Sequence, residues 1–145
     1  MNIIVKYPIA IAAVFIWVGF LGGISFMEAW LKFRAPGITL PLGLGIGRLV
    51  FNMLNKVELV LAIIILGSML YQGIDGFQWK DLFFLIPFLL LILQTVWLLP
   101  ALDARAEMHI QGQDVPASSL HFYYAAIEVI KVVCLMIFGA NLFKL

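Results

Sequence analysis

The third apolar run of the chain reads LFFLIPFLLLILQTVWLL at residues 82–99 and contains no charged residue. A transmembrane helix needs about 20 mainly apolar residues, because each helical residue adds about 1.5 Å and the hydrocarbon core is about 30 Å thick. Similar runs at residues 8–31, 45–70 and 119–142 fill most of the remaining chain. The sequence therefore predicts an all-α integral membrane protein with helices at 8–31, 45–70, 82–100 and 119–142.

The overall composition supports this class. Hydrophobic residues make up 64% of the 145 residues and charged residues 12%, about half the roughly 25% that is typical of soluble domains. The net charge of +1 gives no electrostatic basis for binding nucleic acid. Because the connections are too short for a soluble domain, residues 1–145 are predicted to form a single transmembrane domain.

The number of spans predicts the topology. Four spans joined by short connections predict an up-down four-helix bundle with both termini on the same side of the membrane. That side would carry three basic residues, and the opposite side four: Lys6, Lys80 and Lys144 against Lys32, Arg34, Arg48 and Arg105. The positive-inside rule therefore leaves the orientation of this multi-pass protein undecided.

Two glycines in the first span suggest close helix packing. Gly19 and Gly23 form a small-xxx-small pair, a spacing that lets two helices approach closely in lipid. We expect this pair to pack against another of the four spans, with dimerisation as the alternative.

Glycines and prolines also predict where the second and third helices begin and end. Pro36 and Pro41 predict a loop before the second helix, and Gly43, Gly45 and Gly47 precede Arg48 at the start of that helix. After residue 100 the chain could continue as a helix through His109, until Gly112 ends it.

The polar residues of the four runs are concentrated toward one membrane face. Because successive helices alternate in direction, the end of the first, the start of the second, the end of the third and the start of the fourth lie together. The residues that we take as candidates for binding a ligand there are Glu28, Arg48, Asn52, Asn55, Glu58, Gln94, Asp103, Arg105, His121, Tyr124, Glu128 and Lys131.

The spacing of these residues predicts that they face the interior of the bundle. His121, Tyr124, Glu128 and Lys131 recur at three- and four-residue steps, which places them on one face of a helix. A charge that faced lipid at mid-depth would cost about 2.5–3.5 kcal/mol. We therefore expect a polar cavity in which Glu58 and Glu128 pair with Arg48, Lys56, Lys131 or Arg105. The alternative is that these pairs only hold the helices together.

Several functions fit such a cavity. The leading hypothesis is a membrane protein that binds or transports a small molecule or an ion, using buried carboxylates that take up a proton in place of carrying charge. The second is a membrane-embedded enzyme acting on a lipid, sterol or quinone, with His121 or Glu128 as the acid or base. The third is an accessory subunit of a larger membrane complex.

The sequence predicts no metal site and names no cofactor. A carboxylate-bridged dimetal bundle would need Glu-x-x-His on two helices, whereas Glu28, Glu58 and Glu128 are followed three residues later by leucine, leucine and lysine. A single metal at His121, or a haem between His109 and His121, remains a minor alternative. The expected partners are the lipid bilayer, a small molecule, lipid or ion as ligand, and a second copy or a larger membrane complex.

Short motifs along the whole chain resemble those of a known family. The motifs are Trp17-Val-Gly19 with Phe26, Leu49-Val-Phe51, Trp97-Leu-Leu-Pro100 with Arg105, and His121-Phe-Tyr-Tyr124. In their order they resemble a small family of four-span membrane proteins that includes a human transmembrane protein associated with cisplatin resistance. The resemblance implies a membrane bundle and supplies no established reaction. The glutamine and the phenylalanine-proline pair that the family tends to show in its second helix are absent here.

Overall fold

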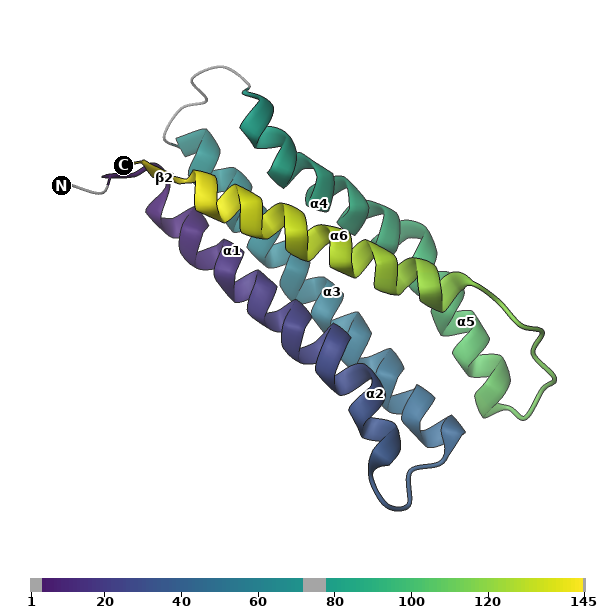
Figure 1. Cartoon of the computed structure of the whole chain (residues 1–145). Helices are drawn as coiled ribbons and strands as arrows, with labels where there is room; N and C mark the ends of the chain where they lie inside the picture. The colour runs from purple at the N-terminus through teal and green to yellow at the C-terminus, as the bar shows by residue number, and fades with distance from the viewer. Residues whose placement is uncertain (1–3, 72–77, 145) are drawn as a thin grey trace.

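The computed structural model describes residues 4–71 and 78–144 and shows a bundle of four long helices (Figure 1). The helices are Pro8–Arg34, Leu40–Tyr71, Trp79–Ile110 and Leu120–Asn141. All four are long and apolar enough to cross a membrane. The predicted all-α four-helix bundle is therefore confirmed.

Two of the long helices are continuous but change their winding along the way. The first consists of α1 (Pro8–Phe20), the π-helical segment η1 (Leu21–Glu28), α2 (Ala29–Leu31) and the 3₁₀ turn η2 (Lys32–Arg34). The third consists of the 3₁₀ turn η3 (Trp79–Asp81), α4 (Leu82–Leu93), the π-helical segment η4 (Gln94–Leu98) and α5 (Leu99–Ile110). The second and fourth are the single α-helices α3 (Leu40–Tyr71) and α6 (Leu120–Asn141).

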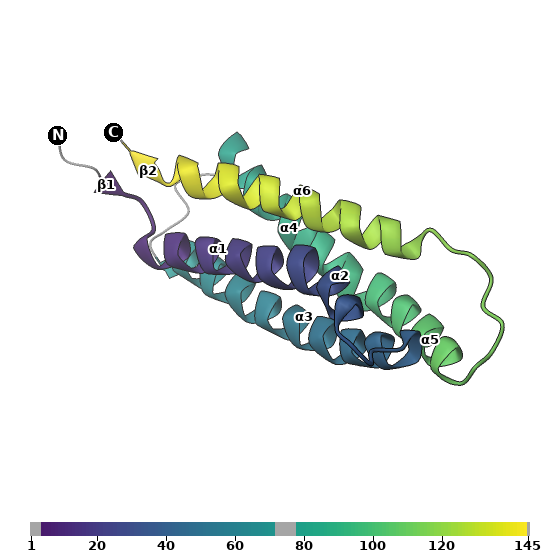
Figure 2. The same ribbon diagram turned by 60° about the horizontal axis from the view of Figure 1, so that its bottom comes forward.

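The four helices form a closed ring of neighbours. α1 packs against α3 and α6, and the third helix closes the ring through contacts of α5 with α3 and of α4 with α6 (Figures 1 and 2). Both ends of the described chain lie at the same end of the bundle, where β1 (Ile4–Val5) pairs antiparallel with β2 (Phe143–Lys144). The predicted up-down topology, with the termini on one side, is therefore confirmed.

The side chains of the bundle separate into a packed core and an apolar outer surface. Trp17, Ile65 and Leu135 are completely buried, whereas Leu49 and Val96 are 76% and 73% exposed. Contact of such an outer surface with water would be unfavourable, whereas lipid solvates it without penalty. This distribution suits a multi-pass integral membrane protein.

The second helix begins earlier than predicted. It starts at Leu40 rather than residue 45, so Pro41 lies in its first turn and Gly43 lies inside it. Proline is tolerated there, because the first N–H groups of a helix have no helical partner. A Cβ atom at Gly43 would overlap the ring of Phe33, so a larger residue there would force this ring to move. Gly43, which lies before the predicted start at residue 45, therefore belongs to the helix.

The third helix is also longer than the predicted 82–100. It runs to Ile110, and Gly112, with φ of +71°, terminates it as expected. Pro100 does not end the helix, because it lies near the start of α5, directly after η4. A proline cannot donate the usual hydrogen bond to the carbonyl four residues earlier, and the wider π-helical turn accommodates that loss.

The prediction that Gly19 and Gly23 pack against another span of the chain is wrong. A Cβ atom added to either glycine would meet nothing within 4 Å. The reason is the orientation of α1, which turns Trp17 and Leu21 toward the core. Gly19 is two residues beyond Trp17, a rotation of about 200°, and it therefore faces outward.

Candidate functional site

Three ionisable side chains meet in the middle of the bundle and are shielded from solvent. Glu58 of α3 is 1% exposed, and Glu128 and Lys131 of α6 are 0% exposed. The ammonium of Lys131 forms an ion pair with Oε2 of Glu58 and lies 2.7 Å from Oε1 of Glu128. We call Glu58, Glu128 and Lys131 the buried ion cluster.

Neutral donors from the other two long helices complete the coordination of the carboxylates. Trp17 Nε1 donates to Glu58 Oε2 at 2.8 Å, and Ser25 Oγ donates to Glu128 Oε2 at 2.6 Å. Gln94 Nε2 donates to Glu128 Oε1 at 2.7 Å. Buried charge is tolerated only when it is paired and hydrogen-bonded, and here all four long helices contribute to that requirement.

The π-helical segments position two of these donors. In a regular α-helix, eight residues at about 100° each would rotate Ser25 about 80° away from the face of Trp17. In η1 the wider turn reduces the rotation per residue, which returns Ser25 to the interior. In the third helix, Gln94 is the first residue of η4. Both irregular segments thus lie where their helices supply a hydrogen-bond donor to Glu128.

Two buried polar atoms have no hydrogen-bond partner among the described residues. They are Oε1 of Gln94 and Oγ of Ser68. Gln94 is 1% exposed, and its amide nitrogen already contacts Glu128. An unsatisfied buried acceptor is costly, so the carbonyl of Gln94 marks a position beside the buried ion cluster where a donor is missing.

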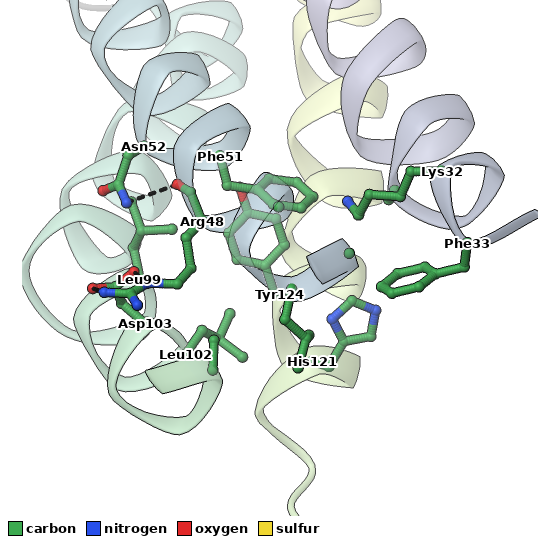
Figure 3. Close-up of a pocket in the computed structure, with 15 residues that line it drawn as sticks. Lys32, Phe33, Arg48, Phe51, Asn52, Leu99, Leu102, Asp103, His121 and Tyr124 are labelled. Carbon is green, nitrogen blue, oxygen red and sulfur yellow. Dashed lines mark hydrogen bonds and ion pairs between the residues drawn. The ribbon is translucent and has the colours of Figure 1, made fainter. Parts of the chain in front are cut away.

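A pocket of about 120 Å³ opens at the end of the bundle remote from the termini (Figure 3). It lies between the end of the first long helix and the starts of α3 and α6, with α5 as its remaining wall. The residues that line it are Ala29, Lys32, Phe33, Gly43, Leu44, Gly47, Arg48, Phe51, Asn52, Leu99, Leu102, Asp103, Ala106, His121 and Tyr124.

Aromatic rings and one lysine shape the interior of this pocket. Figure 3 shows Lys32 extending from the first helix toward the rings of Phe51 and Tyr124, with His121 close to Phe33. The Lys32 ammonium lies 5.3 Å from the centre of the Phe51 ring and forms a 3.1 Å ion pair with Glu28. Phe51 and Tyr124 pack edge to face, with ring centres 5.2 Å apart.

The opposite wall is fastened by an arginine. Arg48 of α3 binds Asp103 of α5 through two nitrogens, with Nε–Oδ1 at 2.6 Å and Nη2–Oδ2 at 3.0 Å. Its third nitrogen pairs with Glu107. Asn52 donates to the carbonyl of Arg48, one turn earlier on the same helix, at 2.8 Å. Arg48 is therefore committed to two carboxylates and connects α3 to α5.

Tyr124 separates the pocket from the buried ion cluster. It lines the pocket, is only 5% exposed, and precedes Glu128 by one turn of α6. Leu98 and Leu99 pack with Tyr124 to form the same partition. The predicted single cavity is thus divided into a pocket near the end of the bundle and a tightly packed ion cluster beneath it.

The structure places the twelve predicted residues in three groups. Arg48, Asn52, Asp103, His121 and Tyr124 line the pocket. Glu58, Gln94, Glu128 and Lys131 meet around the buried ion cluster. Glu28, Asn55 and Arg105 belong to neither: they bind Lys32, Thr95 and the carbonyl of Pro116, respectively.

Sequence reasoning missed Trp17, Ser25, Lys32 and Phe51. Lys32 could have been found, because it stands four residues after Glu28 at the predicted polar end of its helix. Trp17, Ser25 and Phe51 carry no charge that could have marked them. As for metals, no three His, Cys, Asp or Glu side chains among residues 4–71 and 78–144 are grouped so that they could hold an ion.

No family model, no curated protein and no solved structure matches the chain. The resemblance to the four-span family therefore stays a prediction.

Proposed function

We propose that the chain is an integral membrane protein that binds a small molecule or an ion in the pocket, near one membrane face. The observation that carries this proposal is the composition of the pocket. Lys32, His121 and the hydroxyl-bearing Tyr124 come from two different helices and converge on an apolar wall. A few convergent polar groups on an apolar lining are typical of ligand sites.

The charges of the pocket restrict the chemistry of its ligand. Lys32 is paired with Glu28, and Arg48 is paired with Asp103 and Glu107. The pocket therefore offers no unpaired strong cation for a free anion. It favours a polar or weakly charged group that accepts a hydrogen bond from His121 or Tyr124.

The size of the pocket points in the same direction. At about 120 Å³ it is smaller than the roughly 300–1,000 Å³ of sites for drug-sized ligands. Phe51, Leu99 and Leu102 supply apolar contact area. These features suit a small amphipathic molecule, or the polar group of a lipid whose chain lies outside the bundle.

Native mass spectrometry of the gently purified protein tests this proposal. We expect a co-purified adduct on the wild type that is lost in Leu102→Trp, because the larger side chain fills the pocket. The matched control is Val96→Trp on the same long helix, where the side chain is 73% exposed and away from the pocket. Equal adducts on both variants would place the ligand elsewhere.

An enzymatic role is the second candidate, because His121 and Tyr124 line the same pocket three residues apart. Both side chains can transfer protons to a bound hydroxyl or ester. Lipid extracts from membranes that contain the wild type or His121→Ala would then differ in one lipid class. Identical extracts, together with a retained adduct, would leave binding without chemistry.

The accessory-subunit alternative relies on the outward-facing glycines of the first helix. Gly19 is exposed and Gly23 is half-buried, and among the described residues nothing lies within 4 Å of a Cβ atom added to either. The same mass spectra report the oligomeric state and any co-purified protein. A monomer without a protein partner would count against this alternative.

A further inference from the structure

The buried ion cluster contains one negative charge more than it can neutralise. If all three groups were ionised, Glu58 and Glu128 would contribute two negative charges and Lys131 one positive charge. Each of the three side chains is at most 1% exposed. An uncompensated charge at this depth carries a desolvation penalty that its partners do not offset.

The elements packed around the cluster supply no further cation. α1 contributes Trp17, η1 contributes Ser25 and η4 contributes Gln94, all of them neutral. On α6, Tyr124 precedes Glu128 by one turn, and its phenol side chain carries no positive charge. Within the described part of the chain, Lys131 is therefore the one positive charge that contacts the two carboxylates.

The hydrogen bonds of the cluster identify where a positive group is missing. Donors reach Oε2 of Glu58 and both oxygens of Glu128. None of these donors reaches Oε1 of Glu58. The carbonyl of Gln94, beside Glu128, is likewise without a donor among the described residues. The cluster thus has one excess negative charge and one carboxylate oxygen that these donors do not reach. A single positively charged ligand at this oxygen would neutralise the excess charge.

We propose that the buried ion cluster binds one proton for its two carboxylates, which resides on Oε1 of Glu58. Water supplies the proton: a hydronium ion transfers it to the carboxylate, leaving water, a carboxylic acid and no net charge in the cluster. Two carboxylates that share a site commonly hold one proton between them. The proposal goes beyond the pocket function, because it holds whether or not a small molecule occupies the pocket.

A metal cation fits the cluster less well than a proton. Hard cations such as Ca²⁺ and Mg²⁺ take six or more oxygen ligands. Three of the four carboxylate oxygens already accept N–H or O–H groups, and Lys131 occupies the space between the two side chains. A proton needs a single oxygen lone pair.

The packing indicates the side from which the proton exchanges. Toward the termini, Leu61, Leu135 and Phe138 close the interior with apolar side chains. In the other direction Tyr124 stands between Glu128 and the pocket. Its hydroxyl is the one polar side-chain group in this partition, so exchange through the pocket end is favoured.

Infrared spectroscopy of the purified protein at neutral pH tests the proposal. We expect the carbonyl stretch of a protonated carboxyl group, which shifts in heavy water and disappears in both Glu58→Gln and Glu128→Gln, because either variant leaves one carboxylate paired with Lys131. Asp81→Asn, at the other end of the bundle, should keep the band. In the wild type alone, raising the pH should remove the band, so the test does not depend on the folding of a variant.

Two outcomes would overturn the proposal. One is a wild-type spectrum without a protonated carboxyl at neutral pH. The other is stoichiometric sodium or potassium, found by elemental analysis of the desalted wild type and absent from Glu58→Gln. The variant Leu102→Trp separates this proposal from the pocket function. Its infrared band reports the bound proton and should remain, whereas its mass adduct reports the pocket ligand and should be lost.

Discussion

The indole N–H of Trp17 donates a hydrogen bond to Oε2 of Glu58 at 2.8 Å, joining two residues that are 41 positions apart in the chain. Both side chains are buried, and the bond connects α1 to α3 at the level of the ion cluster. An aromatic residue that the sequence marks only as apolar thus serves as a hydrogen-bond donor to a buried carboxyl group.

Replacing Trp17 with phenylalanine should therefore destabilise the bundle. The variant removes a buried hydrogen bond, which typically contributes about 0.5–1.5 kcal/mol to the free energy of unfolding. The measurement is thermal unfolding in detergent. Trp97→Phe is the control, because Trp97 is 50% exposed and should have little effect. Equal losses for the two variants would show that the indole bond contributes nothing.

Removing Lys131 tests whether the cluster depends on its single ammonium. Lys131→Met leaves two buried carboxylates without a cation, and breaking a buried pair in this way typically costs about 3–5 kcal/mol. The triple variant Lys131→Met, Glu58→Gln, Glu128→Gln should recover most of that loss, because replacing a whole buried ionic group is often neutral. A triple variant no more stable than Lys131→Met alone would contradict this.

Two serines offer a matched comparison. Ser25 donates to Glu128 at 2.6 Å, whereas Ser68 Oγ has no partner among the described residues. Ser25→Ala should cost about 1.5–3 kcal/mol, as for other hydrogen bonds to charged groups, whereas Ser68→Ala should be neutral or stabilising because it removes an unsatisfied buried hydroxyl. Chemical denaturation of the two variants in one detergent compares them; the reverse order would argue against the assigned geometry.

The bound proton makes stability depend on pH. The slope of the unfolding free energy against pH is proportional to the number of protons bound by the unfolded chain minus the number bound by the folded chain. If the folded state holds one proton more, stability should fall as pH rises, by at most about 1.4 kcal/mol per pH unit. Melting temperatures between neutral and alkaline pH should show this slope for the wild type, and Glu128→Gln should be flatter. Parallel slopes would be incompatible with a bound proton.

The architecture and part of the site could be predicted from the sequence because they depend on regular helical spacing. Glu128 and Lys131 lie three residues apart on an apolar helix, and this spacing alone placed them inward. Glu58 could be predicted to need a basic partner for the same reason, although its partner could be any of several residues.

The remaining contacts could not be predicted, since they depend on departures from that spacing. Ser25 reaches Glu128 because η1 is π-helical, and Gln94 begins the π-helical η4. The division between pocket and ion cluster depends on the packing of Tyr124 against Phe51. Such packing follows from the three-dimensional arrangement of all four helices.

A crystal structure of the protein grown from a lipid phase tests the central claim most directly, because it shows whether the pocket holds a ligand. The account predicts non-protein density in contact with His121 and Tyr124, over the apolar wall formed by Phe51 and Leu102. A pocket closed by its own side chains, or filled only with water at high resolution, would contradict the proposed binding function.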